Sequence, residues 1–175
     1  MWFDELTFDS MRIGVAQVDG LDSTDTIVGL LSARSANIIF LSGASFAGFN
    51  VIDSRRLYNM LRIPIIIISR EKPDNASVKR ALRKHFTDWN KRWELVRDLG
   101  RIHSFAPRLP DQPLHFEAVG IPADLAKRMI QAYCTTSRVP EPIRVAGIVA
   151  KGLALGGREL AALRHEVSNA ELQRL

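Results

Sequence analysis

The chain has 175 residues, 46% of them hydrophobic and 25% charged, which suits one folded domain with a substantial core and excludes a disordered chain. A single cysteine, Cys134, excludes an internal disulfide and a cysteine-based zinc site, and the apolar run at 63–68 is far shorter than the roughly 20 residues that span a bilayer. The 24 Lys and Arg outnumber the 19 Asp and Glu, so the formal charge of +5 favours a polyanionic partner such as nucleic acid. The cysteine usage and the acidic N-terminus predict a cytoplasmic protein without membrane contact.

The first third of the chain predicts a strand followed by a helix. Residues 5–18 lean towards β structure and end in a short apolar strand that runs into a turn at Asp19. The capping residues at 22–25 precede apolar residues at helical spacing, which predicts a helix to about Ser35.

A parallel βαβ unit is predicted next. Residues 37–41 and 63–68 are apolar runs without alternating polar positions, the pattern of central strands that are buried on both faces. Between them lie a glycine-bearing loop at 42–50 and a helix at about 51–61. Strand, loop, helix and strand in this order predict a right-handed crossover.

The clearest helix is predicted over residues 76–99, where apolar side chains recur three or four positions apart. Its other faces are basic and form either a nucleic-acid contact or a solvated surface. The basic residues are Lys79, Arg80, Arg83, Lys84, Lys91, Arg92 and Arg97. Three prolines mark 106–113 as a loop, and 114–119 is predicted as an edge strand.

Two further helices are predicted, over 123–133 and 141–155. The polar segment after Gly156 carries apolar residues at helical spacing and predicts one more helix. We therefore expect a single α/β domain at 1–156 and a C-terminal helical tail at 157–175.

Ligands of open α/β sheets bind beyond the carboxyl ends of the parallel strands. Here the loop 42–50 follows one such strand and residues 69–72 follow the next. Glycines permit close backbone approach, so the loop amides offer a phosphate cradle, unless the loop is only a tight turn. The candidate nucleic-acid contacts at this edge are Ser42, Gly43, Gly48, Asn50, Arg70 and Lys72.

Carboxylates gather near the same edge. Asp19, Asp22 and Asp25 lie where the strand meets the first helix, and Asp53 lies at the other loop. Hard cations such as Mg²⁺ take oxygen ligands, so Asp22 and Asp19 are candidate catalytic residues, and Asp22 and Asp53 are candidate Mg²⁺ ligands. An Asp at a helix start also caps free amides, and capping is the alternative for Asp22 and Asp25.

Three segments together resemble an archaeal family filed as domain of unknown function ninety-nine. They read Val-Asp-Gly-Leu-Asp-Ser-Thr at 18–24, Leu-Ser-Gly-Ala-Ser-Phe-Ala-Gly-Phe-Asn-Val-Ile-Asp at 41–53 and Pro-Glu-Pro-Ile-Arg at 140–144. The resemblance covers the chain to about Gly156, and that family is similar, remotely, to endonuclease V. It implies a three-layer ribonuclease-H-like fold with central parallel strands, and it adds Arg144 to the candidate nucleic-acid contacts.

The chain departs from the endonuclease V pattern at the positions that matter for catalysis. Ser42 stands where that enzyme has a catalytic Asp, and Asp22 is the nearest counterpart of its catalytic Glu. The first-strand Asp and the Gly-Ile-Asp-Asp signature have no equivalent, and the two histidines are replaced by Phe49 or Gly48 and by Ile121. The resemblance therefore implies a fold that lacks its first strand or two and a metal site that is half present.

From these observations we expect a nucleic-acid-binding protein derived from a nuclease fold, without endonuclease V activity. One alternative is a divergent Mg²⁺-dependent nuclease that uses Asp22 with Asp19 or Asp53. Another is a non-catalytic structural or assembly subunit. Loss of the first strand would leave residues 37–41 with an open edge beside 14–18, and from that edge we expect a homodimer.

Overall fold

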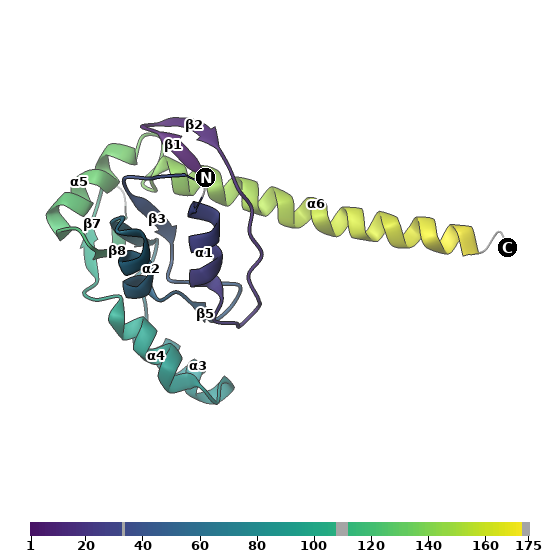
Figure 1. Cartoon of the computed structure of the whole chain (residues 1–175), viewed down its shortest axis with the longest axis horizontal. Coiled ribbons are helices and arrows are strands. Elements are labelled where there is room, and N and C mark those ends of the chain that lie inside the picture. Colours follow the sequence, from purple (N-terminus) through teal and green to yellow (C-terminus); the bar gives the residue numbers. More distant parts are fainter. Residues whose placement is uncertain (33, 108–111, 173–175) are drawn as a thin grey trace. The chain divides into compact units, whose positions relative to one another are not determined.

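Figure 1 shows the chain as a computed structural model, which describes residues 1–32, 34–107 and 112–172, with side chains as far as residue 156. It comprises two compact units, Met1–Ile143 and Arg144–Leu175. The described part of the first unit is a mixed α/β structure around a four-stranded sheet. The second unit consists of most of helix α6 (Glu141–Leu172).

The sheet confirms the parallel pair that the sequence predicts. Its order is β3 (Ile39–Ser42), β6 (Ile65–Ser69), β8 (Leu114–Val119) and β7 (His103–Phe105). Strands β3 and β6 are parallel, whereas β8 is antiparallel to both of its neighbours. The prediction of 114–119 as an edge strand is wrong, because β7 pairs with the outer side of β8. The three residues of β7 are too few to show strand periodicity in the sequence.

Alternate residues of the strands pack into two separate cores, as the pleat of a strand requires. Ile66 and Ile68 of β6 pack with Ala126 and Ile130 of α5 (Ala123–Tyr133). Ile65 and Ile67 pack with the second core, which includes Leu57 of α2 (Ser54–Leu61) and side chains of α1 (Ser23–Leu31). The continuous apolar runs of β3 and β6 are thus explained by burial on both faces.

The N-terminal segment forms a hairpin and lacks the strand predicted at 15–18. Strand β1 (Trp2–Asp4) pairs antiparallel with β2 (Thr7–Ser10), and residues 11–17 hold no strand. The amide of Gln17 donates to the Asp22 carboxylate and not to a neighbouring strand. A side-chain carbon at Gly14 would collide with Thr26 of α1, whereas Val15 is 88% exposed. The segment therefore lies against α1 and presents apolar side chains outward.

The basic segment predicted as one helix is divided into α3 (Asn75–His85) and α4 (Trp89–Asp98). The chain leaves the first helix at Phe86, whose backbone is extended with φ −130° and ψ 131°. The Phe86 ring contacts the Phe49 ring edge-to-face, with centroids 5.5 Å apart. Asp88 then occupies the N-cap of α4. This tertiary contact overrides the helical periodicity on which the prediction rested.

Helix α6 continues through Gly156 and Gly157, where the sequence predicted the end of one helix and the start of a separate tail. Glycine weakens a helix interior by roughly 1 kcal/mol without forbidding it, so two adjacent glycines do not by themselves end a helix. No described helix combines the length and apolar character needed to cross a membrane.

Within the described residues, strand β3 is an edge of the four-stranded sheet, and from this edge we propose a dimer. The amides of Ile39 and Gly43 donate to carbonyls of the chain that forms β6. Because backbone groups alternate in direction along a strand, those of Phe40 point away from β6. Unpaired edges of this kind pair readily with a second chain. We expect a dimeric mass in light scattering at micromolar concentration. A soluble, folded monomer at the same concentration would contradict this expectation.

Candidate functional site

The candidate site is assembled at the carboxyl end of β3 by three segments. These are the turn before α1, the loop that follows β3, and the start of α2. The amide of Asp19 donates to the carbonyl of Ala47 over 2.8 Å, and the amide of Asp53 donates to the Thr24 hydroxyl over 2.9 Å. The structure therefore brings together most of the polar residues that the sequence singled out.

The loop 42–50 is a small β-hairpin and not an open cradle. Strands β4 (Ser45–Phe46) and β5 (Asn50–Val51) pair antiparallel, with Gly48 at φ +81° in the tip between them. A side chain at Gly48 would collide with the Asp19 carboxylate, which accepts from the Phe49 amide at 2.8 Å. The glycine is therefore required by close approach of the two loops.

One amide in this loop and one just after it already have internal acceptors. The Gly43 amide donates to the Ile68 carbonyl and the Ile52 amide to the Ala44 carbonyl, both over 2.9 Å. Ser42 is exposed, and Gly43 has open space where a side chain would be. The geometry gives the phosphate cradle no support beyond these two residues.

Asp22 is bound by protein groups although it stands at the N-cap of α1. Its carboxylate accepts from the Gln17 amide at 3.1 and 3.2 Å and from Asn50 Nδ2 at 2.5 Å, and it makes no capping bond. The Asn50 amide, followed by the Gln17 amide, lowers the pKa of Asp22 below its ordinary value. The side chain of Asp22 therefore does not cap α1, contrary to the alternative prediction. Asp22 anchors the turn that precedes the helix instead.

Asn50 is the buried centre of this arrangement, with 0% of its surface exposed. Its Oδ1 accepts from the Ser23 amide at 3.1 Å, and its Nδ2 donates to the Gln17 carbonyl and to Asp22. The Ser23 hydroxyl donates to the Asn50 carbonyl at 3.3 Å. Asn50 is thus a structural cross-link between two loops, and its side chain is not presented to a ligand.

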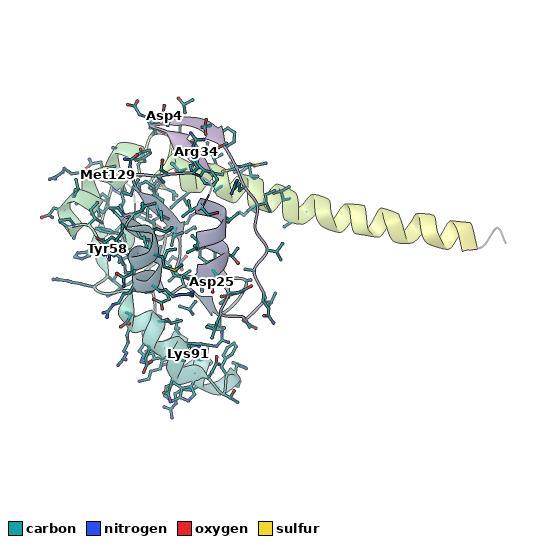
Figure 2. All side chains as sticks on the ribbon, in the orientation of Figure 1. Asp4, Asp25, Arg34, Tyr58, Lys91 and Met129 are labelled. Carbon is teal, nitrogen blue, oxygen red and sulfur yellow. The ribbon has the colours of Figure 1, made fainter. Side chains whose placement is uncertain are left out.

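Asp53 and Asp25 also have defined structural partners. Asp53 caps α2 by accepting from the Arg56 amide at 2.8 Å, which explains why this helix begins later than predicted. Asp25 accepts two bonds from the Arg56 guanidinium, at 2.6 and 3.2 Å. The ion pair raises the pKa of Arg56. Asp25 of α1 is labelled in Figure 2.

The described carboxylates do not fit a two-metal centre. Each of Asp19, Asp22 and Asp53 accepts a hydrogen bond from a backbone amide. In the parts of the chain that the structure describes, no three His, Cys, Asp or Glu side chains lie close enough to hold one ion. Two-metal hydrolysis needs several such ligands around ions about 4 Å apart.

Within the described residues, the predicted basic contacts Arg70 and Lys72 form no ion pair with the carboxylates of this cluster. Arg70 and Lys72 are exposed in the segment after β6, and the Arg70 carbonyl accepts from the Arg138 guanidinium at 3.3 Å. Arg144 belongs to the second unit. Ser42, Gly43, Arg70 and Lys72 are thus the candidate contacts of the first unit whose side chains or backbone face open space or solvent.

Arg92 is a residue of the site that the sequence analysis did not single out from the basic helix. Only 6% of it is exposed, and it donates to the carbonyls of Gly20 and Phe49, at 3.0 and 2.9 Å. Its Nε bonds to Asp88 at 2.9 Å. The local signal in the sequence is that Asp88 precedes Arg92 by four residues, a spacing at which the two side chains can form an ion pair on one helix face.

The remaining cations of α3 and α4 form a basic surface over tryptophan rings, which we call the helical-hairpin surface. Lys79 Nζ lies 5.2 Å from the centre of the Trp93 ring, and the Arg83 guanidinium lies 5.2 Å from that of Trp89. The two helices contact each other and lie side by side in Figure 1. Figure 2 labels Lys91 on this hairpin. The exposed cations are Arg80, Arg83, Lys84, Lys91 and Arg97.

The comparisons with known proteins point to one family. The family model described as endonuclease dU matches residues 1–154. The UPF0215 protein of Pyrococcus furiosus is 38% identical over 143 residues, which are 79% of this chain and 72% of that protein. The UPF0215 protein of Methanothermobacter thermautotrophicus is 36% identical over 159 residues, which are 89% of this chain and 74% of that protein. The archaeal relatives implied by the sequence motifs are therefore found.

Solved structures give a consistent result. A protein of unknown function from Archaeoglobus fulgidus aligns with a TM-score of 0.70 and 28% identity, covering 79% of this chain and 78% of that chain. Human ENDOV aligns with a TM-score of 0.46 and 14% identity, covering 79% of this chain and 62% of that chain. The second likeness is too distant to support an argument about mechanism.

Proposed function

The chain belongs to the endonuclease dU family, and from this premise we propose that it is a cytoplasmic nucleic-acid-binding protein that retains the frame of a nuclease without its catalytic centre. The frame that we propose is ribonuclease-H-like. The parallel pair of β3 and β6, with helices packed in the cores of both faces, supports that assignment.

The observation that carries the proposal is the helical-hairpin surface. Exposed cations on α3 and α4 offer phosphate contacts. Trp93 and Trp89 are partly exposed beside them, each with a cation, Lys79 or Arg83, over one ring face. Proteins that bind single strands without sequence preference combine these two features, a positive surface and stacking rings. Ser42, Gly43, Arg70 and Lys72 would extend the contact towards the carboxyl edge of the sheet.

We expect weak binding to single-stranded oligonucleotides with a steep dependence on salt. If about five phosphates are contacted, release of their counterions implies a roughly 100-fold loss of affinity between 50 and 200 mM salt. Fluorescence anisotropy with a labelled oligonucleotide measures this loss. Absence of binding at 50 mM salt would sink the proposal.

Two variants with the same change of charge separate this surface from general electrostatics. Arg83→Glu with Lys91→Glu removes two cations from the helical-hairpin surface, and Arg128→Glu with Lys151→Glu removes two exposed cations elsewhere. The first pair should weaken binding at least tenfold and reduce the salt slope by about two contacts. The second pair should change both much less. Equal effects would show that the hairpin has no special role.

The family description, endonuclease dU, favours a second candidate, a Mg²⁺-dependent nuclease that acts at deoxyuridine. In this chain both oxygens of Asp22 already accept hydrogen bonds, from Gln17 and Asn50, and one oxygen each of Asp19 and Asp53 accepts from a backbone amide. Among the described residues, no three His, Cys, Asp or Glu side chains lie close enough to hold one ion. We therefore expect no cleavage of DNA that contains deoxyuridine or deoxyinosine, with Mg²⁺ or Mn²⁺, in a gel assay. Cleavage that Asp22→Asn abolishes while the fold is kept would establish the nuclease and overturn our assignment.

A further inference from the structure

A pocket of about 300 Å³ lies beside β7, remote from the carboxylate cluster. Its wall is formed by residues 101–104, by Phe116 of β8 and by the first turn of α5. Strands β3 and β7 lie at opposite edges of the sheet. The pocket is therefore separate from the candidate site at the end of β3.

The charge of the pocket is predominantly positive. Arg101 and Lys127 line it together with His103, and Asp124 is the acidic side chain of the described wall. Among the described residues, no carboxylate forms an ion pair with Arg101 or Lys127. Lys127 Nζ instead lies 5.4 Å from the centre of the Phe105 ring. Arg101 and Lys127 thus line one pocket, and neither forms an ion pair with a described carboxylate.

Other polar groups of the same wall add hydrogen-bonding capacity. The His103 ring is stacked on Phe116, with centroids 5.2 Å apart and an interplanar angle of 26°, which restrains the imidazole. Ser104 contributes a hydroxyl group. Helix α5 begins after Pro122 without a side-chain cap, so its positive end adds to the field of the cations.

We propose that this pocket binds the phosphate group of a small molecule, such as a nucleotide or pyrophosphate. Arg and Lys together supply the charge-assisted bonds that phosphate oxygens accept, and Arg adds a planar fork of donors. The volume is at the lower end for small-ligand pockets, so it suits a phosphate with a small attached group. The phosphate site is independent of the proposed nucleic-acid surface.

Isothermal titration calorimetry with pyrophosphate, adenosine monophosphate and adenosine tests the site. Both phosphates should bind and adenosine should not. Arg101→Gln and Lys127→Gln should each weaken binding about tenfold, the typical effect of losing one charge-assisted bond. Asp124→Asn should tighten binding several-fold, because it removes the opposing charge. Arg128→Gln is the matched control, since Arg128 is exposed on the same helix and does not line the pocket.

The signs of these effects decide the outcome. No binding of either phosphate, or equal weakening by Arg128→Gln and Lys127→Gln, overturns the proposal. So does weaker binding by Asp124→Asn, because an anion site must gain from losing that carboxylate. Arg101, Asp124 and Lys127 are exposed, so these variants are expected to fold, and circular dichroism checks this. If Arg101→Gln or Lys127→Gln unfolds, the other still has the opposite predicted sign to Asp124→Asn. If Asp124→Asn unfolds, the comparison of Lys127→Gln with Arg128→Gln decides.

Discussion

Glu117→Gln is expected to raise the free energy of unfolding by about 3 kcal/mol at pH 8 and by less than about 1 kcal/mol at pH 5. Glu117 lies on β8 opposite Ile67, so its side chain shares the sheet face of the second core. Only 4% of the residue is exposed, and burial raises the pKa of its carboxyl from 4.5 to about 7.

The sign of this effect follows from proton binding. Between pH 4.5 and about 7 the folded chain holds the Glu117 proton more tightly than the unfolded chain does. The contribution of the neutral carboxyl is therefore present at low pH and is lost as the pH rises through this window. Glutamine has nearly the same shape and stays neutral, so in Glu117→Gln the free energy of unfolding no longer falls as the pH rises through this window.

Urea unfolding at both pH values measures the effect, with Glu94→Gln as the matched control. Glu94 is exposed on α4, and its substitution should change the free energy of unfolding little at either pH. An equal response of Glu117→Gln at pH 5 and pH 8 would show that the carboxyl is not neutral in the folded chain at pH 5.

The parts of the fold that could be predicted from the sequence are those that local pattern determines. The apolar runs that became β3 and β6 needed no knowledge of their neighbours, because burial on both faces leaves a direct mark on composition. Helix α5 matches its predicted bounds for a similar reason. The prediction of a strand at 15–18 is wrong because a β-like pattern does not ensure that a second strand lies alongside. The Gln17 amide in this segment donates to the Asp22 carboxylate instead.

The candidate site was predicted as a set of residues but not as a geometry. The sequence brought Asp19, Asp22, Gly48 and Asn50 to attention, and the structure brings them together. Whether their polar groups face a ligand or one another depends on contacts across 28 to 33 residues, which local pattern does not reveal. The sequence pattern alone therefore did not reveal that the carboxylates predicted as metal ligands accept hydrogen bonds from backbone amides.

Arg92→Met is expected to lower the free energy of unfolding by about 3 kcal/mol or more, because a buried cation cross-links three segments. Its guanidinium donates to the carbonyls of Gly20 and Phe49 and to Asp88. It also lies 4.3 Å from the centre of the Phe86 ring. Methionine fills much of the volume but leaves both carbonyls without this donor, at about 1–3 kcal/mol each if they stay buried.

The expected loss is specific to the position and not to the charge. Lys91→Met removes a neighbouring, exposed cation from the same helix and should cost under about 0.5 kcal/mol in urea unfolding. Arg92→Lys should fall between the two, since one ammonium group cannot reproduce the planar fork that spans the two carbonyls and Asp88. Hydrogen exchange should quicken in Arg92→Met at the Asp19 and Phe49 amides, which lie in the loops that Arg92 joins. Unchanged exchange there, together with unchanged stability, would mean that Asn50 alone holds the two loops together.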